Sequence, residues 1–325
     1  MVFQVCIRTI LVFALWTLAP VYSAPGPNTP THKPQKKTSA TQLVQIAELE
    51  DKRVAESSGL VASRRNPGIY WTHNDSGNAP ELFATDIKGR ALARFTVTGA
   101  SNIDWEDIAA GGGTGDSAVL YIGDIGDNGR SRNDTAIYRV WEPEVNPEKT
   151  GQEGQTMLAE KYPFIYPDGH HDAETLLVHP KTEEIFIVTK EDSGISGVYR
   201  FPMPLTRNRV VTLQKVATVS FTNPFMYRGR AVGRLATGGD ISPDGTRIVI
   251  RTYTDAYEWT IKPNETVTEA LKRKPRQIPV PWMGSIAGGR FQIGQFEAIC
   301  YTHDGKALLT TSEGVPCPLW KVPLK

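Results

Sequence analysis

The stretch NIDWEDIAAG, residues 102–111, places three acidic side chains beside a tryptophan and then continues into an apolar run. A short apolar run of this kind is typical of a buried strand. Related stretches recur at HHDAETLLVHP (170–180), ATGGDISPDG (236–245), GQFEAICYTHDG (294–305) and, more weakly, ESSGLVASRRNPG (56–68). The leading acids are 50, 68, 66 and 57 residues apart, running from Glu56 to Glu106, Glu174, Asp240 and Glu297. The chain is therefore predicted to contain five repeats, each opened by an acid.

Each repeat continues with a second strand-like run, such as GIYWTHND (68–75), AVLYIGDI (118–125) or EIFIVTK (184–190). The first three repeats also contain two further strand-like runs. Repeats of about four strands predict an all-β protein, a β-propeller. We expect five blades, with six as the alternative if a long connection contains another. The segment QLVQIAEL (42–49) is expected to pair with the last blade and close the ring, and one short helix is expected at 265–274.

The ends of the chain predict export. Residues 1–23 combine an early arginine, an apolar run and small residues near Ser23, which is typical of a secretory signal peptide. Residues 24–41 are rich in proline, lysine and threonine and predict a disordered leader, so that 42–325 forms a single propeller domain. We expect a secreted monomer without a membrane anchor, or a periplasmic one if the host is Gram-negative.

Net charge, cysteine content and glycosylation sequons lead to further predictions. The formal net charge of +1 disfavours a nucleic-acid or membrane-surface partner, which requires a basic excess. Cys300 and Cys317 remain after signal removal, and in an exported chain they predict a disulfide. The sequons at Asn74, Asn133 and Asn264 predict a glycoprotein only in a eukaryotic secretory pathway.

Propeller topology brings the leading acids together. The innermost strand of every blade begins at the same mouth of the central channel, so these side chains should form a ring there. Crowded, partly buried carboxylates must take up protons or a cation. Oxygen ligands without a thiolate favour a hard ion, and we expect Ca²⁺ held by Ser57, Glu106, Glu174, Asp240 and Glu297. In the alternative, the acids accept backbone N–H groups of neighbouring blades and bind no metal.

Polar residues at the ends of the second strands should surround this ring, because the loops that follow return to the same face. They are His73, Asp75, Asp124, Asp127, Lys190, Arg251 and Asp255. The turns RRNPG, PKTEE, SPDG and THDG fall on the opposite face and have the composition of ordinary turns.

Over nearly the whole mature chain, ESSGLV, NIDWEDIA, LYIGDIGDN, DAETLLVHP and RTYTDAYEW resemble a group of functionally uncharacterised secreted bacterial-type β-propeller proteins. The predicted architecture also resembles the calcium-dependent apyrases, which hold an axial calcium ion and hydrolyse nucleotide phosphates. That resemblance places Ser57, Glu106, Glu174 and Glu297 at the calcium, whereas TGGD in the fourth repeat departs from the pattern. Five-bladed glycosidases of the arabinanase type are similar in using three carboxylates from different blades.

Three functions remain open. In a metal-dependent hydrolase of a small phosphate or ester, Asp104 or Asp172 would be the general base and Lys190 or Arg251 would hold the anionic group. His171 would transfer a proton or make a structural hydrogen bond. In a glycosidase acting on a polysaccharide, Glu106 and Glu174 would be acid and base, with Trp71 or Trp105 as a sugar platform. The third function is a binding or scaffold propeller without catalysis.

Overall fold

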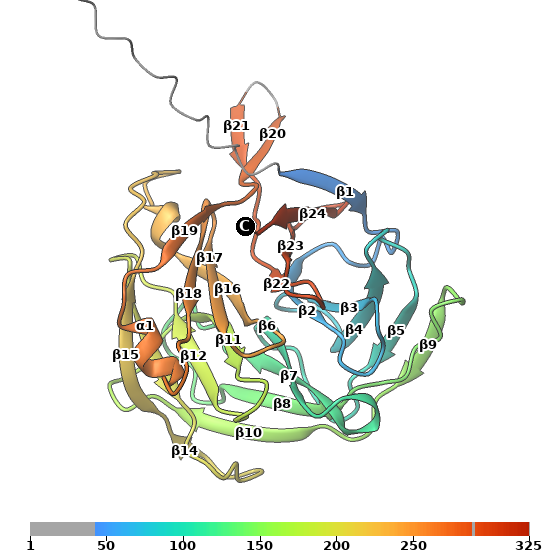
Figure 1. Cartoon of the computed structure of the whole chain (residues 1–325), viewed down its shortest axis with the longest axis horizontal. Coiled ribbons are helices and arrows are strands. Elements are labelled where there is room, and N and C mark those ends of the chain that lie inside the picture. Colours follow the sequence, from blue (N-terminus) through green and yellow to red (C-terminus); the bar gives the residue numbers. More distant parts are fainter. Residues whose placement is uncertain (1–42, 288–289, 325) are drawn as a thin grey trace, which may run out of the picture. The chain divides into compact units, whose positions relative to one another are not determined.

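The computed structural model describes residues 43–287 and 290–324. The described chain forms a five-bladed β-propeller, in which five sheets of four or five strands are arranged around a common centre (Figure 1). The prediction of five blades is confirmed, and the six-bladed alternative is wrong. The predicted signal peptide (1–23) and leader (24–41) lie outside the described residues.

The inner strands of each blade follow one another from the centre outwards (Figure 1). At the outer edges, β9 of blade 1 and β14 of blade 2 come from later connections along the chain, and β1 completes blade 5. Blade 1 contains β2 (Ser57–Ala62), β3 (Ile69–Asn74), β4 (Glu81–Asp86), β5 (Ala93–Thr96) and β9 (Gln152–Gln155). Blade 2 contains β6 (Trp105–Gly112), β7 (Ala118–Asp124), β8 (Ala136–Trp141), β10 (Glu160–Ile165) and β14 (Val211–Thr212). Blade 3 contains β11 (Ala173–Val178), β12 (Ile185–Thr189), β13 (Ile195–Arg200) and β15 (Gln214–Ser220).

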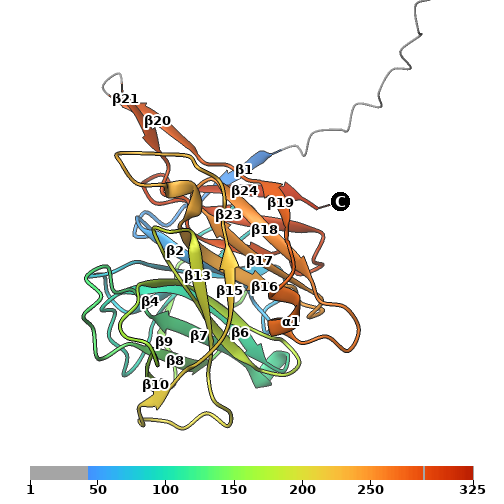
Figure 2. The same cartoon turned by 90° about the vertical axis from the view of Figure 1, so that its left-hand side faces the viewer.

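Blade 4 contains β16 (Ala236–Ile241), β17 (Arg247–Thr252), β18 (Asp255–Thr260) and β19 (Arg276–Pro279). Blade 5 contains β22 (Ile299–Tyr301), β23 (Ala307–Thr311), β24 (Pro318–Pro323) and β1 (Val44–Glu48). Between blades 4 and 5, β20 (Met283–Ala287) and β21 (Arg290–Ile293) form a separate hairpin that projects away from the blades (Figure 2).

The predicted closure of the ring is confirmed by β1. This strand pairs antiparallel with β24, with Val44 opposite Lys321 and Gln45 opposite Trp320. The first strand of the propeller is therefore the outer strand of its last blade. Pairing the two ends of the domain in one sheet leaves no open gap in the ring.

The core consists of apolar layers between successive blades, and the alternation of side chains along a strand builds them. In β7, Leu120 and Ile122 pack in the cluster between blades 1 and 2, whereas Val119 and Tyr121 pack in the cluster between blades 2 and 3. All seven residues of β7 are buried. A strand that is apolar on both faces thus supplies two blade interfaces.

Helix is almost absent from the described chain. The one α-helix, α1 (Val267–Leu271), lies within the range predicted to be helical. It begins at a capping box, in which the Thr266 hydroxyl accepts from the Glu269 N–H and the Glu269 carboxylate accepts from the Thr266 N–H. No helix among the described residues is long and apolar enough to cross a membrane.

The predicted disulfide is wrong, because Cys300 and Cys317 are both buried free thiols. Strand register explains why they do not meet. Cys300 is opposite Leu309, and Leu309 is opposite Lys321, whereas Cys317 precedes Lys321 by four residues. Two strand spacings across the sheet and four residues along it exceed the roughly 7 Å that a disulfide allows between Cα atoms.

The three sequons differ in accessibility. Asn133 and Asn264 are exposed. Asn74 is 6% exposed, and its side chain accepts from the N–H groups of Ala55 and Glu56 and donates to the Arg53 carbonyl. In the folded chain, Asn74 is therefore not presented as a glycosylation site.

Candidate active site

In blades 2, 3 and 4, a β-bulge near the start of the inner strand leaves one residue unpaired. The side chain of this residue does not follow the alternation by which the strand packs against the neighbouring blades. The residue skipped by the pairing is Glu106 in β6, Glu174 in β11 and Thr237 in β16. Bulges re-aim side chains and are common beside active sites. In blade 1 the irregularity falls at Ser58 and Gly59, and in blade 5 Glu297 lies just before β22. Every blade thus contributes at least one residue at, or just before, the start of its inner strand.

In blades 1, 3 and 5, a residue one or two positions after the second strand lies at the same level. The N–H groups of Asp75, Lys190 and Glu313 donate to the carbonyls of the residues that precede the inner strands of blades 1, 3 and 5, at 2.9, 2.8 and 2.9 Å. Tyr253 follows β17 in the same way in blade 4. These residues and the bulge residues therefore meet at one mouth of the channel.

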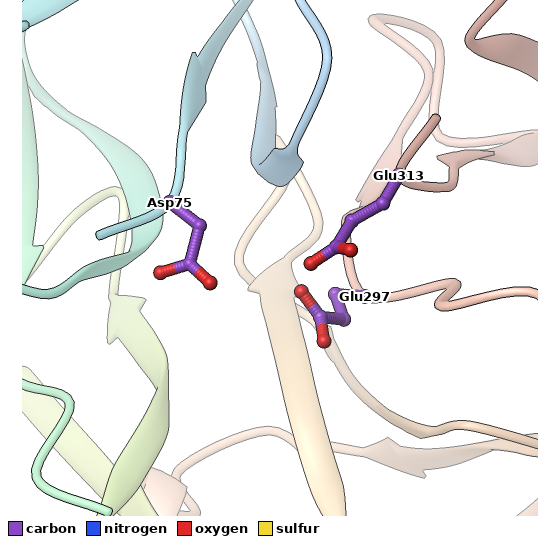
Figure 3. A group of neighbouring side chains, drawn as sticks. All are labelled: Asp75, Glu297 and Glu313. Atoms are coloured by element: carbon purple, nitrogen blue, oxygen red, sulfur yellow. The ribbon is translucent and has the colours of Figure 1, made fainter. Parts of the chain in front are cut away.

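Seven carboxylates gather at this mouth and are called the acid site here. They form three groups whose ligand atoms lie within 4.8 Å of one another: Asp75, Glu297 and Glu313; Asp75, Asp104 and Glu106; and Glu106, Asp172 and Glu174. Figure 3 shows the first group, with three carboxylates from separate segments directed towards a common space. Asp75 and Glu106 each belong to two groups. The acid site is therefore continuous.

One lysine is built into the acid site. The Lys190 ammonium group donates to the carboxylate of Glu174 and lies 3.2 Å from the Tyr253 hydroxyl oxygen. That hydroxyl group is 3.0 Å from Oε1 of Glu297. A hydrogen-bonded chain thus connects Glu174 in blade 3 with Glu297 in blade 5.

Burial and mutual repulsion raise the pKa of most of these acids. The pKa of Asp75 is raised to about 6, mainly by burial and next by the charge of the neighbouring Glu297. Burial, then the Asp75 charge, raises the pKa of Asp104 to about 6 and that of Glu106 well above its usual value. Burial, then the Glu297 charge, raises the pKa of Glu313 to about 8. Ionising the acid site is therefore costly without a cation.

Within the described residues, two carboxylate oxygens of the acid site lack hydrogen-bond partners. Oε2 of Glu174 and Oε2 of Glu297 are buried and accept no hydrogen bond, although their side chains are only 3% and 4% exposed. Buried polar atoms normally have a partner. A cation coordinated by oxygen would supply one, and an all-oxygen donor set fits a hard ion such as Ca²⁺ or Mg²⁺. These residues could hold a metal.

Gly126 leaves room beside the carboxylates. A Cβ atom at this position would collide with the carboxylates of Glu106 and Asp104. Glycine is therefore the residue that permits the chain after β7 to approach the acid site so closely.

Two other acids hold the blades together, as in the alternative that requires no metal. Asp107 in blade 2 accepts the N–H groups of Leu176 in blade 3 and Gly239 in blade 4, at 2.9 and 3.2 Å. Asp240 accepts the N–H group of Tyr301 in blade 5 at 2.8 Å. Both are hydrogen-bonded across blade boundaries.

The predicted metal ligands are therefore brought together in part. Glu106, Glu174 and Glu297 belong to the acid site. Asp240 is directed to the backbone of blade 5 instead, and Thr237 occupies the bulge position of blade 4. Ser57 Oγ lies 2.8 Å from the hydroxyl oxygens of Thr72 and Thr311, so the hydroxyl group is engaged within the blades.

Only some of the predicted catalytic residues lie at the acid site. Asp104, Asp172 and Lys190 lie in the acid site. His171 does not belong to the three carboxylate groups. Its Nδ1 atom lies 3.1 Å from the Glu191 carboxylate, and its Nε2 atom lies 3.1 Å from the Asp168 carboxylate. Arg251 is fully buried, and two of its hydrogen bonds go to the carbonyls of Thr252 and Pro281, so it does not face the channel mouth as an anion-binding group.

Three aromatic side chains predicted at this face are buried. Trp71 and Trp105 are both 0% exposed and pack between blades 1 and 2, so neither offers a sugar platform. His73 is also 0% exposed, and burial lowers its pKa to about 4. The glycosidase interpretation thereby loses its predicted sugar-binding surface.

Several residues of the site were missed from the sequence. Tyr253 directly follows the second strand of its blade, as Asp75 and Lys190 do, and Glu313 is the second residue after its strand. Comparing the polar residues that follow the second strands across the five repeats would have identified both. Asp107, which bonds the blades together outside the acid site, was also missed because it stands directly beside Glu106.

Comparisons with known proteins add no function. No known protein family matches the chain, and no curated protein matches it. A glutaminyl cyclase from Myxococcus xanthus is similar in structure, with a TM-score of 0.47 and 13% identity over 87% of this chain and 97% of that one. A hydrazine synthase from Kuenenia stuttgartiensis gives a TM-score of 0.36 and 12% identity over 80% of this chain and 56% of that one. The resemblance to apyrases stays a prediction.

Proposed function

We propose that the protein is an exported, calcium-dependent hydrolase that acts on a small phosphate or ester substrate at the acid site. The observation that supports this most is the overlap of the three carboxylate groups through Asp75 and Glu106. Shared carboxylates allow more than one cation to be bound side by side. The signal-like composition of residues 1–23 supports export to a calcium-rich medium.

The burial of the ligands supports catalysis in addition to binding. Glu106, Glu174 and Glu297 are buried, whereas Asp75, Asp104 and Glu313 are only partly buried. The inner carboxylates would hold the cation, while the outer edge stays open to a substrate. When bound, calcium supplies a Lewis acid that polarises a phosphoryl or ester oxygen.

Asp104 is the residue best placed to act as general base. It is partly buried and belongs to the same group as Asp75 and Glu106. Burial raises its pKa to about 6, so it is mainly ionised at neutral pH and can accept a proton from water. Asp172 is engaged with the Asp127 N–H group at 2.9 Å.

Hydrolysis of p-nitrophenyl phosphate and p-nitrophenyl acetate, with calcium or with EGTA, tests this function. We expect turnover of at least one compound with calcium and none with EGTA. Glu106→Gln should abolish the calcium-dependent turnover, because Glu106 belongs to two groups. Glu258→Gln is the matched control, since Glu258 is a buried acid that pairs with Arg276 in blade 4. Calcium-independent turnover, or none of either compound, would contradict the proposal.

A further inference from the structure

Among the residues that the structure describes, the acid site has no free cationic side chain for an anionic substrate. Lys190 is paired with Glu174, and Arg251 is fully buried. A substrate with a second anionic group, beyond the one bound at the cation, therefore needs a positively charged partner from a neighbouring segment. The connection between β15 and β16, residues 221–235, contains three arginines.

Two of these arginines are presented by a tight turn. The N–H groups of Tyr227 and Arg230 donate to each other's carbonyls, at 2.9 and 3.0 Å. The residues between them, Arg228 and Gly229, have φ angles of 47° and 82°. Positive φ at both central positions defines a type I′ turn, which fixes the backbone from which the two arginines extend.

The turn borders the acid site through a cavity of about 240 Å³. Arg228, Arg230, Tyr253 and Gln295 line it. The Tyr253 hydroxyl group is 3.0 Å from Oε1 of Glu297, and the Gln295 carbonyl accepts from the Glu313 N–H at 2.9 Å. The cavity and the acid site therefore share a wall.

Both guanidinium groups are available to a ligand. Arg228 is exposed and stacks over Tyr227, and it makes no ion pair within the described part of the chain. Arg230 pairs with Asp192 at 3.0 Å, but their side chains are 52% and 67% exposed. An exposed pair of this kind contributes little stability, and arginine binds phosphate groups in bidentate pairs.

We propose that Arg228 and Arg230 form a subsite for a second anionic group, so that the substrate is a phosphoester with a further phosphate. The subsite deepens the proposed function and rests on it. One phosphate would be hydrolysed at the acid site, while the other is held in the cavity between Tyr253 and the turn.

Binding of non-hydrolysable analogues tests the subsite without relying on turnover. Propane-1,3-diphosphonate carries two anionic groups and propylphosphonate carries one. With calcium present, we expect calorimetry to show the diphosphonate binding roughly 10- to 100-fold more tightly. Arg228→Gln with Arg230→Gln should remove this preference and leave calcium affinity unchanged. Arg207→Gln with Arg209→Gln, at two exposed arginines between β13 and β14, is the charge-matched control and should keep it.

Hydrolysis of fructose 1,6-bisphosphate and fructose 6-phosphate separates the two proposals. A higher kcat/KM for the bisphosphate, lost in the double variant through KM, supports the subsite. Turnover of both sugars at equal kcat/KM, or equal binding of the two phosphonates, overturns the subsite and leaves the hydrolase standing. Absence of calcium binding overturns both.

Discussion

The ammonium group of Lys190 donates a hydrogen bond to the carboxylate of Glu174 inside the acid site. Their side chains are only 6% and 3% exposed. Lys190 thus neutralises part of the charge of seven neighbouring carboxylates and acts as a cation built into the chain. Any metal ion that binds must share the acid site with this lysine.

Replacing Lys190 with Met should therefore have opposite effects with and without calcium. Without calcium, the variant should unfold more easily by roughly 3–5 kcal/mol, because a buried carboxylate loses its partner. With calcium, Glu174 becomes a free ligand, so the rise in melting temperature should exceed that of the unmodified protein. Lys274→Met, at an exposed lysine before β19, is the control. Equal calcium-induced rises in melting temperature in the Lys190→Met variant and in the unmodified protein would show that Lys190 does not compete with the ion.

Gly126→Ala tests the acid site sterically without changing its charge. The added Cβ would collide with the carboxylates of Glu106 and Asp104. Displaced ligands should weaken calcium binding roughly 10- to 100-fold, as measured by calorimetry. Gly129→Ala is the matched control, because the contacts of its Cβ would be no shorter than 3.4 Å. The idea fails if the two variants bind calcium equally well.

Asp240→Ala distinguishes a metal ligand from a residue that holds the blades together. The Asp240 carboxylate accepts the N–H groups of Tyr301 and Ile241 at 2.8 Å each. Leaving both unpaired should lower the free energy of unfolding by roughly 2–4 kcal/mol. The calcium-induced rise in melting temperature should stay as in the unmodified protein. A variant that no longer responds to calcium would restore Asp240 as a ligand.

The rise in melting temperature that calcium causes should be larger at higher pH. The pKa values of Asp75 and Asp104 are raised to about 6 in the folded chain from 3.8, and that of Glu313 to about 8 from 4.5. A carboxyl group with a raised pKa binds its proton more tightly when folded. Its stabilising contribution is therefore complete below the unfolded pKa and is lost as the pH rises through the folded one.

Calcium binds the ionised carboxylates and should offset this loss. The calcium-induced rise in melting temperature should accordingly be larger at about pH 8 than at about pH 5. Melting curves with calcium and with EGTA across this range measure it. A rise that shrinks with pH, or does not change, would show that these acids do not bind the ion.

Repeats and strand patterns predicted the architecture because each blade buries both faces of its inner strands. Spacing of the leading acids gave the number of blades, and the unpaired segment 42–49 gave the closing strand. Topology then placed Glu106, Glu174 and Glu297 at one mouth of the channel. These conclusions depend on period and order along the chain, which a sequence displays directly.

The remaining residues of the site depend on local register, which the sequence does not display. A bulge sends Glu106 to the acid site and leaves Asp107 to bond the neighbouring blades, although the two are adjacent. In blade 4, Thr237 occupies the bulge and the acid comes three residues later, as Asp240. Choosing the nearest acid in each repeat therefore selected a blade-bridging residue as a ligand.

Melting of the protein in EGTA and across a calcium titration tests the acid site most directly. A ligand that binds only the folded chain raises the melting temperature with its concentration. We expect a continuous rise with calcium that Glu106→Gln abolishes and Glu258→Gln retains. An unchanged melting temperature from EGTA to saturating calcium would contradict a calcium site among these carboxylates.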